Sequence, residues 1–360
     1  MLHTCSPTCH HDPSVRRARG PGLTVDFHCH LFDSQVEELV APLPQKAAEL
    51  EMLARTQGEA ACRHNNEVMF PSAFRRMESL EERLGDMDAM GVDIQVLSPS
   101  PTQYYYWADE RLAEELSGIL NERIARACSL HPQRLKGIGS VALQHPRLAV
   151  EQLHHAVEKL GLCGVEVSSL IAGKDLVDSS LEPFWAAAEK LGCVVFLHPL
   201  GTTLGERLAT HYLSNIVGQP LETTIALTKM IFEGVFERFP RLRILAAHGG
   251  GFLASYSGRA LHGAAARPDV GRGTGKAVFD CLRRNVWFDT VVYDPRILRH
   301  LIETFGANRL VVGTDYPFDM GSYNVHELID AIPSITKDER AMILGENALD
   351  LLGMAVSPRH

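Results

Sequence analysis

The chain lacks the features that mark several classes of protein. No apolar run approaches the roughly 18 residues needed to cross a bilayer, and residues 1–22 lack the apolar core of a signal peptide. A net charge of −9 argues against a nucleic-acid or anionic-membrane partner. The eight cysteines follow no disulfide-framework spacing, so we expect reduced thiols in a cytoplasmic protein.

No Gly-x-Gly-x-x-Gly motif follows any strand-like segment, which argues against an open, doubly wound dinucleotide-binding sheet. The 360 residues are 45% apolar and 22% charged, which is typical of an ordinary globular protein with a large core. An α/β barrel of this length can form a single domain.

Short apolar segments recur along the chain and alternate with helical patterns. The strand-like segments are 23–30, 92–98, 136–143, 163–168, 193–198, 243–248, 286–291 and 309–314. Helical patterns occupy 79–90, 110–128, 148–160, 181–191, 221–237 and 337–352. Almost uniformly apolar strands between helices indicate parallel strands that are buried on both faces. Eight such units predict a (β/α)8 TIM-type barrel over residues 23–360.

Two segments depart from this repeat. Residues 1–22 contain Cys5, Cys9, His10 and His11 without a second pair of ligands, and we expect a disordered tail. Residues 33–77 separate the first strand from its helix, whereas such loops usually have about 2 to 6 residues. Because the loops after the strands build the active-site face of a barrel, we predict that 33–77 forms a lid or small insertion subdomain.

Histidines at the strand ends are the most informative feature of the sequence. His28 and His30 close the first strand, and alternation along the strand predicts that Asp26 shares their face. His198 and His248 end the fifth and sixth strands. Parallel barrel strands present their C-terminal ends to one mouth, so we expect these side chains to converge.

Asp315 follows the eighth strand and completes a set of metal-binding side chains. Three neutral imidazoles and one carboxylate leave a position open for water on zinc and lower the pKa of that water. We therefore predict one divalent metal, with zinc favoured and manganese as the alternative. The predicted ligands are His28, His30, His198 and Asp315.

His248 is followed by three glycines, where backbone can approach a ligand closely. We interpret His248 as a general acid/base beside the metal, and Asp315 as a ligand that also handles a proton. Glu166, inside the fourth strand, is the candidate ligand for a second metal, but its position below the strand end favours a mononuclear site.

These residues together resemble a known family. The motifs are Asp26-x-His28-x-His30, His198-Pro199, His248-Gly-Gly-Gly and the segment Gly-Thr-Asp-Tyr-Pro-Phe at 313–318. They resemble the amidohydrolase superfamily. The connecting segments 87–96 and 234–240 are similar to its decarboxylase branch, which contains 2-amino-3-carboxymuconate 6-semialdehyde decarboxylase. The similarity extends over about residues 23–350.

The resemblance implies a distorted barrel, a single divalent metal, and non-oxidative decarboxylation without an organic cofactor. It also implies that His28, His30, His198 and Asp315 are the ligands and that His248 is the catalytic histidine. Members of the branch work as homodimers in which arginines from one subunit reach the site of its neighbour. Two residues of this chain lie where those arginines are expected, Arg259 and Arg267.

The chain departs from the branch at one position. The arginine expected for the substrate carboxylate just after an Asn-Asn pair is absent, because Glu67 follows Asn66. Arg63 is the nearest substitute, with Arg75 and Arg76 further along. The aromatic run from Tyr104 to Trp107 instead predicts a flat, apolar substrate wall.

The sequence thus predicts a metal-dependent decarboxylase that acts on a small carboxylated aromatic compound or an aromatic ring-cleavage product. Two alternatives remain open. The same site could hydrolyse or hydrate a related small carboxylate, and the chain could be a metal-binding barrel without catalytic activity.

Overall fold

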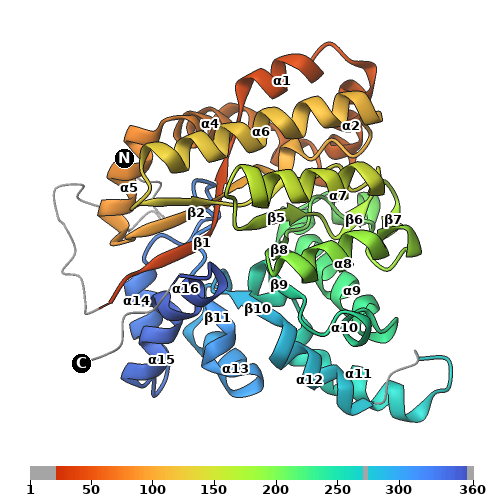
Figure 1. The fold of residues 1–360 in the computed structure, drawn as a ribbon, viewed down its shortest axis with the longest axis vertical. Coiled ribbons are helices and arrows are strands. Elements are labelled where there is room, and N and C mark those ends of the chain that lie inside the picture. Colours follow the sequence, from red (N-terminus) through yellow and green to blue (C-terminus); the bar gives the residue numbers. More distant parts are fainter. Residues whose placement is uncertain (1–21, 271–274, 355–360) are drawn as a thin grey trace.

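The computed structural model describes residues 22–270 and 275–354 (Figure 1). The predicted N-terminal tail therefore lies outside the described residues, apart from Gly22. None of the helices described is both long and apolar enough to span a membrane.

The strands form a closed parallel barrel. One sheet of the barrel has the order β1-β2-β3 and the other β11-β10-β9-β8-β5-β4. An isolated parallel bridge between Asp26 of β1 and Val312, the residue after β11, joins the two sheets. Only Ile138 separates β3 from β4, so these are two halves of one strand and the circle contains eight. The predicted (β/α)8 barrel is confirmed. The strands are β1 (Val25–Leu31), β2 (Ile94–Pro99), β3 (Leu135–Gly137), β4 (Gly139–Ser140), β5 (Gly164–Val167), β8 (Val194–Leu197), β9 (Arg243–Ala246), β10 (Val286–Asp289) and β11 (Leu310–Val311).

Alternating strand side chains form two buried layers. Phe27, Phe196 and Trp287 belong to a cluster inside the barrel, which residues of α16 (Asn347–Leu351) close at one end. Neighbouring side chains such as Val195 point outward and pack against the surrounding helices. A sheet covered on both faces in this way explains why the strands are almost continuously apolar.

Helices surround the barrel and follow the predicted segments closely (Figure 1). Ser79 caps α5 by accepting a hydrogen bond from the backbone of Glu82, and Gly91 ends it with φ = 73°. The outer helices are α5 (Leu80–Met90), α6 (Glu110–Leu130), α7 (Pro146–His154), α8 (Glu182–Leu191), α9 (Gln219–Phe232), α10 (Val235–Arg238), α11 (Leu253–Ala266), α12 (Gly275–Asn285), α13 (Pro295–Phe305), α14 (Val325–Asp330) and α15 (Lys337–Ala341). A small hairpin of β6 (Leu170–Ile171) and β7 (Lys174–Asp175) follows β5.

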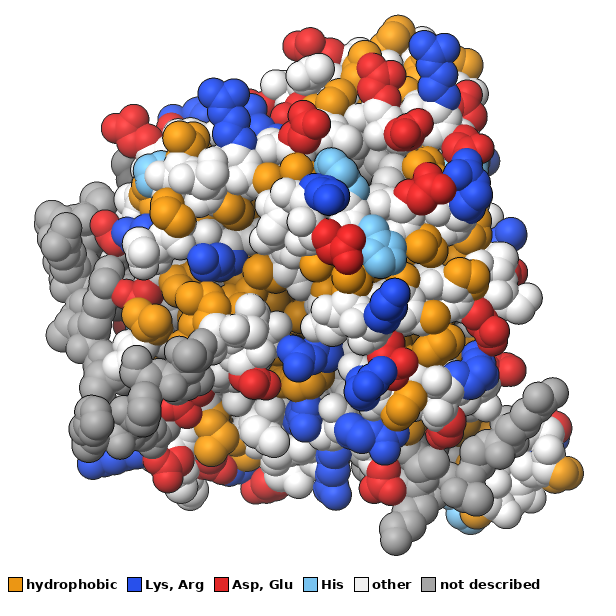
Figure 2. Space-filling model, in the orientation of Figure 1, with side chains coloured by type: hydrophobic (Ala, Val, Ile, Leu, Met, Phe, Trp, Pro, Cys, Tyr) orange, Lys and Arg blue, Asp and Glu red, His pale blue; other side chains and the backbone are white. Residues whose placement is uncertain are grey.

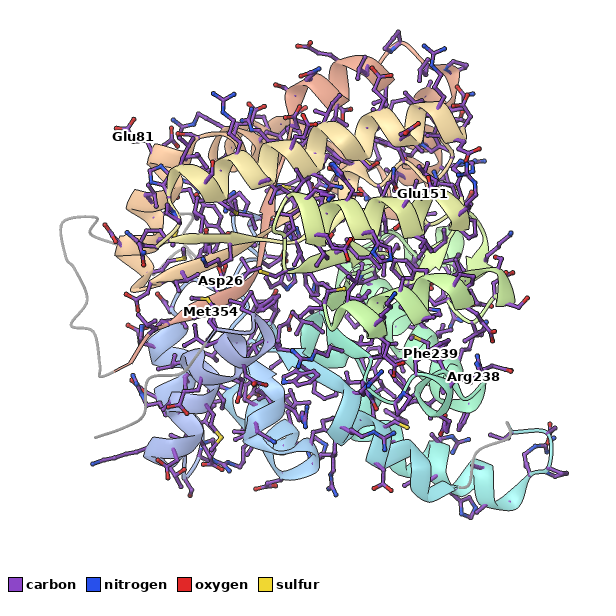
Figure 3. The ribbon with its side chains drawn as sticks, in the orientation of Figure 1. Asp26, Glu81, Glu151, Arg238, Phe239 and Met354 are labelled. Atoms are coloured by element: carbon purple, nitrogen blue, oxygen red, sulfur yellow. The ribbon has the colours of Figure 1, made fainter. Side chains whose placement is uncertain are left out.

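Charged residues are distributed as this layering requires. Glu81, Glu151 and Arg238 are exposed on α5, α7 and α10, whereas Asp26 is buried on β1 (Figure 3). Acidic and basic side chains are interspersed over the face of the molecule in Figure 2.

The segment predicted as a lid is a set of helices. It contains α1 (Ser34–Val40), α2 (Pro44–Gln57), α3 (Glu59–His64) and α4 (Phe70–Glu78), with a π-helical turn over 65–69 between the last two. The buried Lys46 anchors α2 by donating to the hydroxyl of Tyr105 at 3.1 Å and pairing with Glu37 at 3.0 Å. This anchoring places one face of the insertion beside the C-terminal ends of the barrel strands.

Candidate metal centre and active site

Four buried side chains from distant parts of the chain meet at the mouth of the barrel. The ligand atoms of His28, His30, His198 and Asp315 all lie within 4.8 Å of one another. His28 and His30 belong to β1, His198 follows β8, and Asp315 follows β11. The structure therefore brings the predicted ligand set together.

Asp26 does not join this cluster. The pairing of β1 with β2 shifts register between Asp26 and Cys29, which interrupts the alternation of side chains. Asp26 instead accepts hydrogen bonds from Gln95 at 2.9 Å and from the hydroxyl of Thr314 at 2.6 Å. The prediction that Asp26 shares a face with the two histidines is wrong, and the carboxylate fastens β1 to the segment after β11.

The hydrogen bonds of the histidines suit a cation. The Nδ1 of His28 donates to Asp289 at 2.6 Å, and that of His30 donates to the carbonyl of Pro99 at 3.1 Å. In neutral imidazoles each Nε2 then carries a lone pair, and these two atoms lie only 3.2 Å apart. Asp315 Oδ1 is 3.3 Å from both. One divalent metal would be held by these donors.

His198 supports the same conclusion. Neither of its ring nitrogens has a hydrogen-bond partner within the described part of the chain, although both are buried. Buried polar atoms are normally satisfied, so these unpaired nitrogens fit a metal-binding role for His198. Burial and the neighbouring histidines lower the pKa of His198, which keeps it neutral and able to donate a lone pair to a metal.

The electrostatics of the cluster favour positive charge. Burial opposes ionisation of Asp315, but His28 and His30 hold its pKa well below the usual range. Burial likewise opposes protonation of His28, yet Asp315 and Asp289 raise the pKa of this histidine to about 10 in the metal-free protein. A site that retains a proton so strongly is also suited to a metal cation.

His248 lies beside the cluster without being one of the four ligands. Its ring centroid is 5.1 Å from that of His198 and 5.5 Å from that of His28. Its Nδ1 has no hydrogen-bond partner among the described residues, and burial lowers its pKa. A neutral imidazole in this position can accept a proton from a substrate and return it.

The backbone around the site is locally strained. His248 and Asp315 both have φ = 56°, a left-handed conformation that is uncommon for residues other than glycine. Gly251, three residues after His248, has φ = 68°, and a Cβ there would lie 2.1 Å from the carbonyl oxygen of Pro220. The glycines that follow His248 are therefore required for the turn that presents it.

Sequence reasoning missed Asp289, which ends β10 and connects several parts of the site. Besides its bond from His28, it accepts hydrogen bonds from the backbone of His248 at 2.9 Å and of Gly249 at 2.8 Å. Burial opposes its ionisation, but its bond from His28 lowers its pKa. Its position at a strand end, like that of His198, is the signal that could have identified it.

Glu166 and Tyr104 form a buried pair behind the ligands. The Tyr104 hydroxyl donates to Glu166 at 2.5 Å, and the other oxygen of Glu166 is 3.9 Å from Nδ1 of His30. Burial raises the pKa of Glu166. Glu166 lies outside the four-residue cluster, as a mononuclear site requires. We predicted that Tyr104 forms part of the wall of the substrate site. Its side chain is instead buried in its contact with Glu166.

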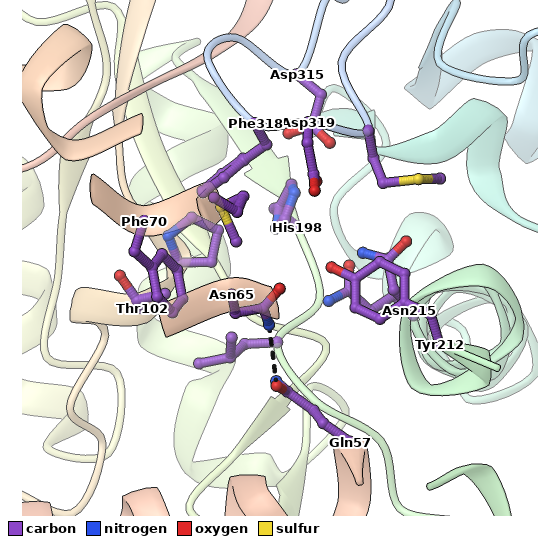
Figure 4. A pocket seen from close by; sticks show the side chains of 15 residues that line it. Gln57, Asn65, Phe70, Thr102, His198, Tyr212, Asn215, Asp315, Phe318 and Asp319 are labelled. Carbon is purple, nitrogen blue, oxygen red and sulfur yellow. Dashed lines mark hydrogen bonds between the residues drawn. The ribbon is translucent and has the colours of Figure 1, made fainter. Parts of the chain in front are cut away.

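A cavity that is open to solvent adjoins the cluster (Figure 4). His198 and Asp315 form part of its lining, and the helical insertion supplies another part. The other lining residues are Gln57, Asn65, Met69, Phe70, Pro101, Thr102, Leu200, Tyr212, Asn215, Gln219, Phe318, Asp319 and Met320.

Two other predicted substrate contacts do not line this cavity. Arg63 is exposed and pairs with Glu59 at 2.6 Å. It lies two positions before Asn65 in a helical segment, so the two side chains project to different sides. Trp107 packs against the ring of Tyr105, with 5.5 Å between centroids.

Arg259 and Arg267 lie on and after α11, away from the cavity of their own chain. Both are exposed, and Arg267 pairs with Asp269 at 2.7 Å. Their predicted role concerns a neighbouring subunit.

The chain has relatives among named decarboxylases. It is 37% identical over 285 residues to a 2-amino-3-carboxymuconate-6-semialdehyde decarboxylase of Dictyostelium discoideum, covering 78% of this chain and 79% of that enzyme. It is 27% identical over 257 residues to a gamma-resorcylate decarboxylase of a Rhizobium species, covering 68% of this chain and 79% of that enzyme.

Solved structures show the same fold. The 5-carboxyvanillate decarboxylase of Novosphingobium aromaticivorans, solved with manganese, superimposes with a TM-score of 0.81 at 21% identity, covering 93% of this chain and 98% of that one. The sequence pattern of the family described as Amidohydrolase matches residues 25–354. The predicted resemblance is therefore confirmed, and the chain belongs to the amidohydrolase family.

Proposed function

We propose that this protein is a metal-dependent, non-oxidative decarboxylase of a small carboxylated aromatic compound or an aromatic ring-cleavage product. The observation that carries the proposal is the meeting of His28, His30, His198 and Asp315 beside His248 at the edge of a cavity. The named decarboxylases among the relatives support the same reaction.

The cluster would hold one divalent metal through its three imidazoles and one carboxylate. When bound, the metal supplies positive charge that orients substrate oxygens and stabilises enolate-like negative charge. Decarboxylation breaks a carbon–carbon bond, and the electron pair that stays on the ring carbon must receive a proton. His248, beside the cluster, would first take up a proton from a substrate hydroxyl or from solvent and then deliver it to that carbon, and Asp315, a member of the cluster, would assist this transfer. Phe70 and Phe318 provide apolar lining against which the ring can pack.

We further propose zinc as the metal, because three imidazole ligands and one carboxylate suit it, with manganese as the alternative. Manganese is present in the related 5-carboxyvanillate decarboxylase. Metal analysis of the protein purified without added metal tests this assignment. We expect close to one equivalent of zinc for each chain. If manganese predominates instead, the assignment of zinc is wrong and manganese is the metal.

We also propose that the protein is a homodimer in which Arg259 and Arg267 of one subunit reach the site of the neighbouring subunit. We propose that it is located in the cytoplasm. The six described cysteines are free thiols, which suits that compartment. Light scattering tests the assembly, with a mass of twice 39.7 kDa expected. A monomer at working concentrations would contradict it.

A panel of hydroxylated and amino-substituted aromatic carboxylates, incubated with metal-loaded protein, tests the reaction. The expected product has lost one carbon dioxide for each substrate consumed. A product that keeps its carboxylate and has gained water would instead support the hydrolase or hydratase alternative. Metal binding without turnover of any compound would support the alternative of a barrel without catalytic activity.

A further inference from the structure

A completely buried arginine, Arg83 of α5, lies beside the metal cluster. Its Nη1 donates to Oε1 of Gln95 at 3.0 Å, and its Nη2 donates to the backbone carbonyl of His30 at 2.5 Å. Within the described ranges, no carboxylate forms an ion pair with Arg83, and its Nε has no hydrogen-bond partner. A buried cation without a counterion is costly for a fold, so this arginine is unusual.

Arg83 supplies a hydrogen bond that the sheet does not give to His30. The backbone N–H of His30 donates to the carbonyl of Tyr316 at 2.8 Å, which continues the parallel pairing of β1 beyond the end of β11. In such a ladder the N–H of Phe318 would next donate to the carbonyl of His30. It donates instead to the carbonyl of Asp315 at 3.1 Å, within a turn. Because a buried carbonyl without a donor is costly, Arg83 takes this place and holds the end of β1 at a predicted ligand.

The other arm of the guanidinium reaches the segment that carries Asp315. Gln95, which accepts from Arg83, donates through Nε2 to Asp26 at 2.9 Å. Asp26 in turn accepts from the backbone N–H of Thr314 at 3.0 Å and from its hydroxyl at 2.6 Å. Because Thr314 immediately precedes Asp315, this chain of hydrogen bonds connects Arg83 to the backbone of a second predicted ligand.

Arg83 also packs against the residue that follows Asp315. Its guanidinium carbon lies 4.9 Å from the ring centroid of Tyr316, which is a cation–π distance. The Tyr316 hydroxyl donates to Asp86 of α5 at 2.8 Å, and this bond fixes the ring. Asp315 Oδ1 and His30 Nε2 are 3.3 Å apart, so a small displacement of either segment would change the spacing of these two ligand atoms.

From this arrangement we infer that Arg83 is a positioning residue of the metal centre, which holds His30 and Asp315 at the separation that the metal requires. A guanidinium suits this task because its planar fork bonds two acceptors in a fixed geometry. The inference rests on the proposed function and adds to it a residue that is neither a ligand nor part of the cavity lining. It also explains why the fold retains a buried cation without a counterion.

Cobalt(II) binding to the metal-free protein tests the inference without turnover. Competition with a chromophoric chelator measures the affinity, and the visible spectrum of bound cobalt reports the geometry of its ligands. Arg83→Met removes both hydrogen bonds, so affinity should fall by about 10–100-fold and the spectrum should change. Arg83→Lys keeps the charge and should fold, but a single ammonium cannot reproduce the fork, so affinity should fall about tenfold. Wild-type affinity and spectrum in either folded variant, or failure of Arg83→Lys to fold by circular dichroism, would overturn the inference.

Arg134→Met is the matched control for the loss of an arginine that binds backbone carbonyls. Arg134 donates to the carbonyls of Asp93 at 2.8 Å and Val92 at 3.2 Å, just before the start of β2 and so at the opposite end of the strand from the metal cluster. Its loss should lower the Tm but leave the affinity and spectrum of cobalt unchanged. Equal losses of affinity in the Arg83 and Arg134 variants would show a general effect of destabilisation and would overturn the inference.

Carbon dioxide release by the metal-loaded wild-type protein tests the proposed function separately. If the wild type binds cobalt and the Arg83 variants show the expected losses, but no aromatic carboxylate releases carbon dioxide, the decarboxylase is contradicted and the positioning role is supported. If the wild type releases carbon dioxide and the Arg83 variants bind cobalt as the wild type does, only the inference is contradicted.

Discussion

The Nδ1 atom of His28 lies 2.6 Å from Oδ2 of Asp289, and both side chains are completely buried. The same carboxylate accepts hydrogen bonds from the backbone of His248 and Gly249. Asp289 thus fixes the orientation of a predicted ligand and holds the turn that carries the predicted catalytic histidine. Carboxylates that orient ligand histidines commonly contribute strongly to metal affinity.

Replacing this carboxylate should weaken the metal site. Asp289→Asn keeps the size of the side chain but removes the charge that stabilises the Nδ1–H tautomer of His28. We expect metal affinity to fall by about 10–100-fold, measured by competition with a chromophoric chelator.

Asp294→Asn is the control for that substitution. Asp294 caps α13, accepts a hydrogen bond from the backbone of Arg296 at 2.8 Å, and lies outside the site. It should change stability slightly and metal affinity not at all. If the Asp289 and Asp294 variants bind the metal with equal affinity, the role assigned to Asp289 is contradicted.

Removal of His248 should separate catalysis from metal binding. His248→Ala deletes the proposed proton-transfer group but none of the four proposed ligands, so kcat should fall by about 10²–10⁴-fold at unchanged metal content. His262→Ala, an exposed histidine on α11, should leave both quantities unchanged. Loss of metal from the His248 variant would identify this residue as a ligand.

The glycine turn after His248 should be intolerant of side chains. Gly251→Ala would place a Cβ 2.1 Å from the carbonyl of Pro220 at φ = 68°, so we expect destabilisation by at least ~1–3 kcal/mol and loss of activity. Gly258→Ala is a suitable control, because it lies within α11 with no atom within 4 Å of the new Cβ. That control should be neutral or stabilising in denaturant unfolding. Equal stability of the two variants would show that the turn can relax.

Metal-free and metal-loaded protein should respond differently to pH. In the metal-free protein the pKa of His28 is raised from 6.5 to about 10, so its protonated form stabilises the fold. That contribution is complete below pH 6.5 and is lost as the pH rises through about 10. We therefore expect the Tm of chelator-treated protein to fall over this range.

Metal binding requires deprotonated His28, so this dependence should be absent from the metal-loaded protein. For the same reason the apparent metal affinity should fall about tenfold for each pH unit of acidification below the pKa of His28. Parallel Tm profiles of the two forms would contradict the assignment of His28 as a ligand.

The barrel and the convergence of the ligands could be predicted from the sequence because both follow from strand register. His198 and Asp315 are far apart in sequence, yet parallel strands bring their C-terminal ends to one mouth. Asp26 could not be placed correctly, because a register shift within β1 leaves no signal in the pattern of apolar residues.

The cavity wall was less predictable, since side-chain direction in the insertion depends on its helical geometry. Arg63 and Asn65 are two positions apart, and the helical turn of the chain directs only Asn65 into the cavity. Asn215 and Tyr212 lie in a segment without apolar periodicity, whose path depends on packing against the rest of the molecule. Tyr104 is turned away from the cavity by its bond to Glu166.

Carbon dioxide release measured during removal and return of the metal tests the central claim most directly. Protein treated with chelator should release no carbon dioxide from the preferred aromatic carboxylate, and adding one equivalent of zinc or manganese should restore release with one carbon dioxide for each substrate consumed. Release that persists in fully metal-free protein, or substrate loss without carbon dioxide in the restored protein, would contradict a metal-dependent decarboxylase.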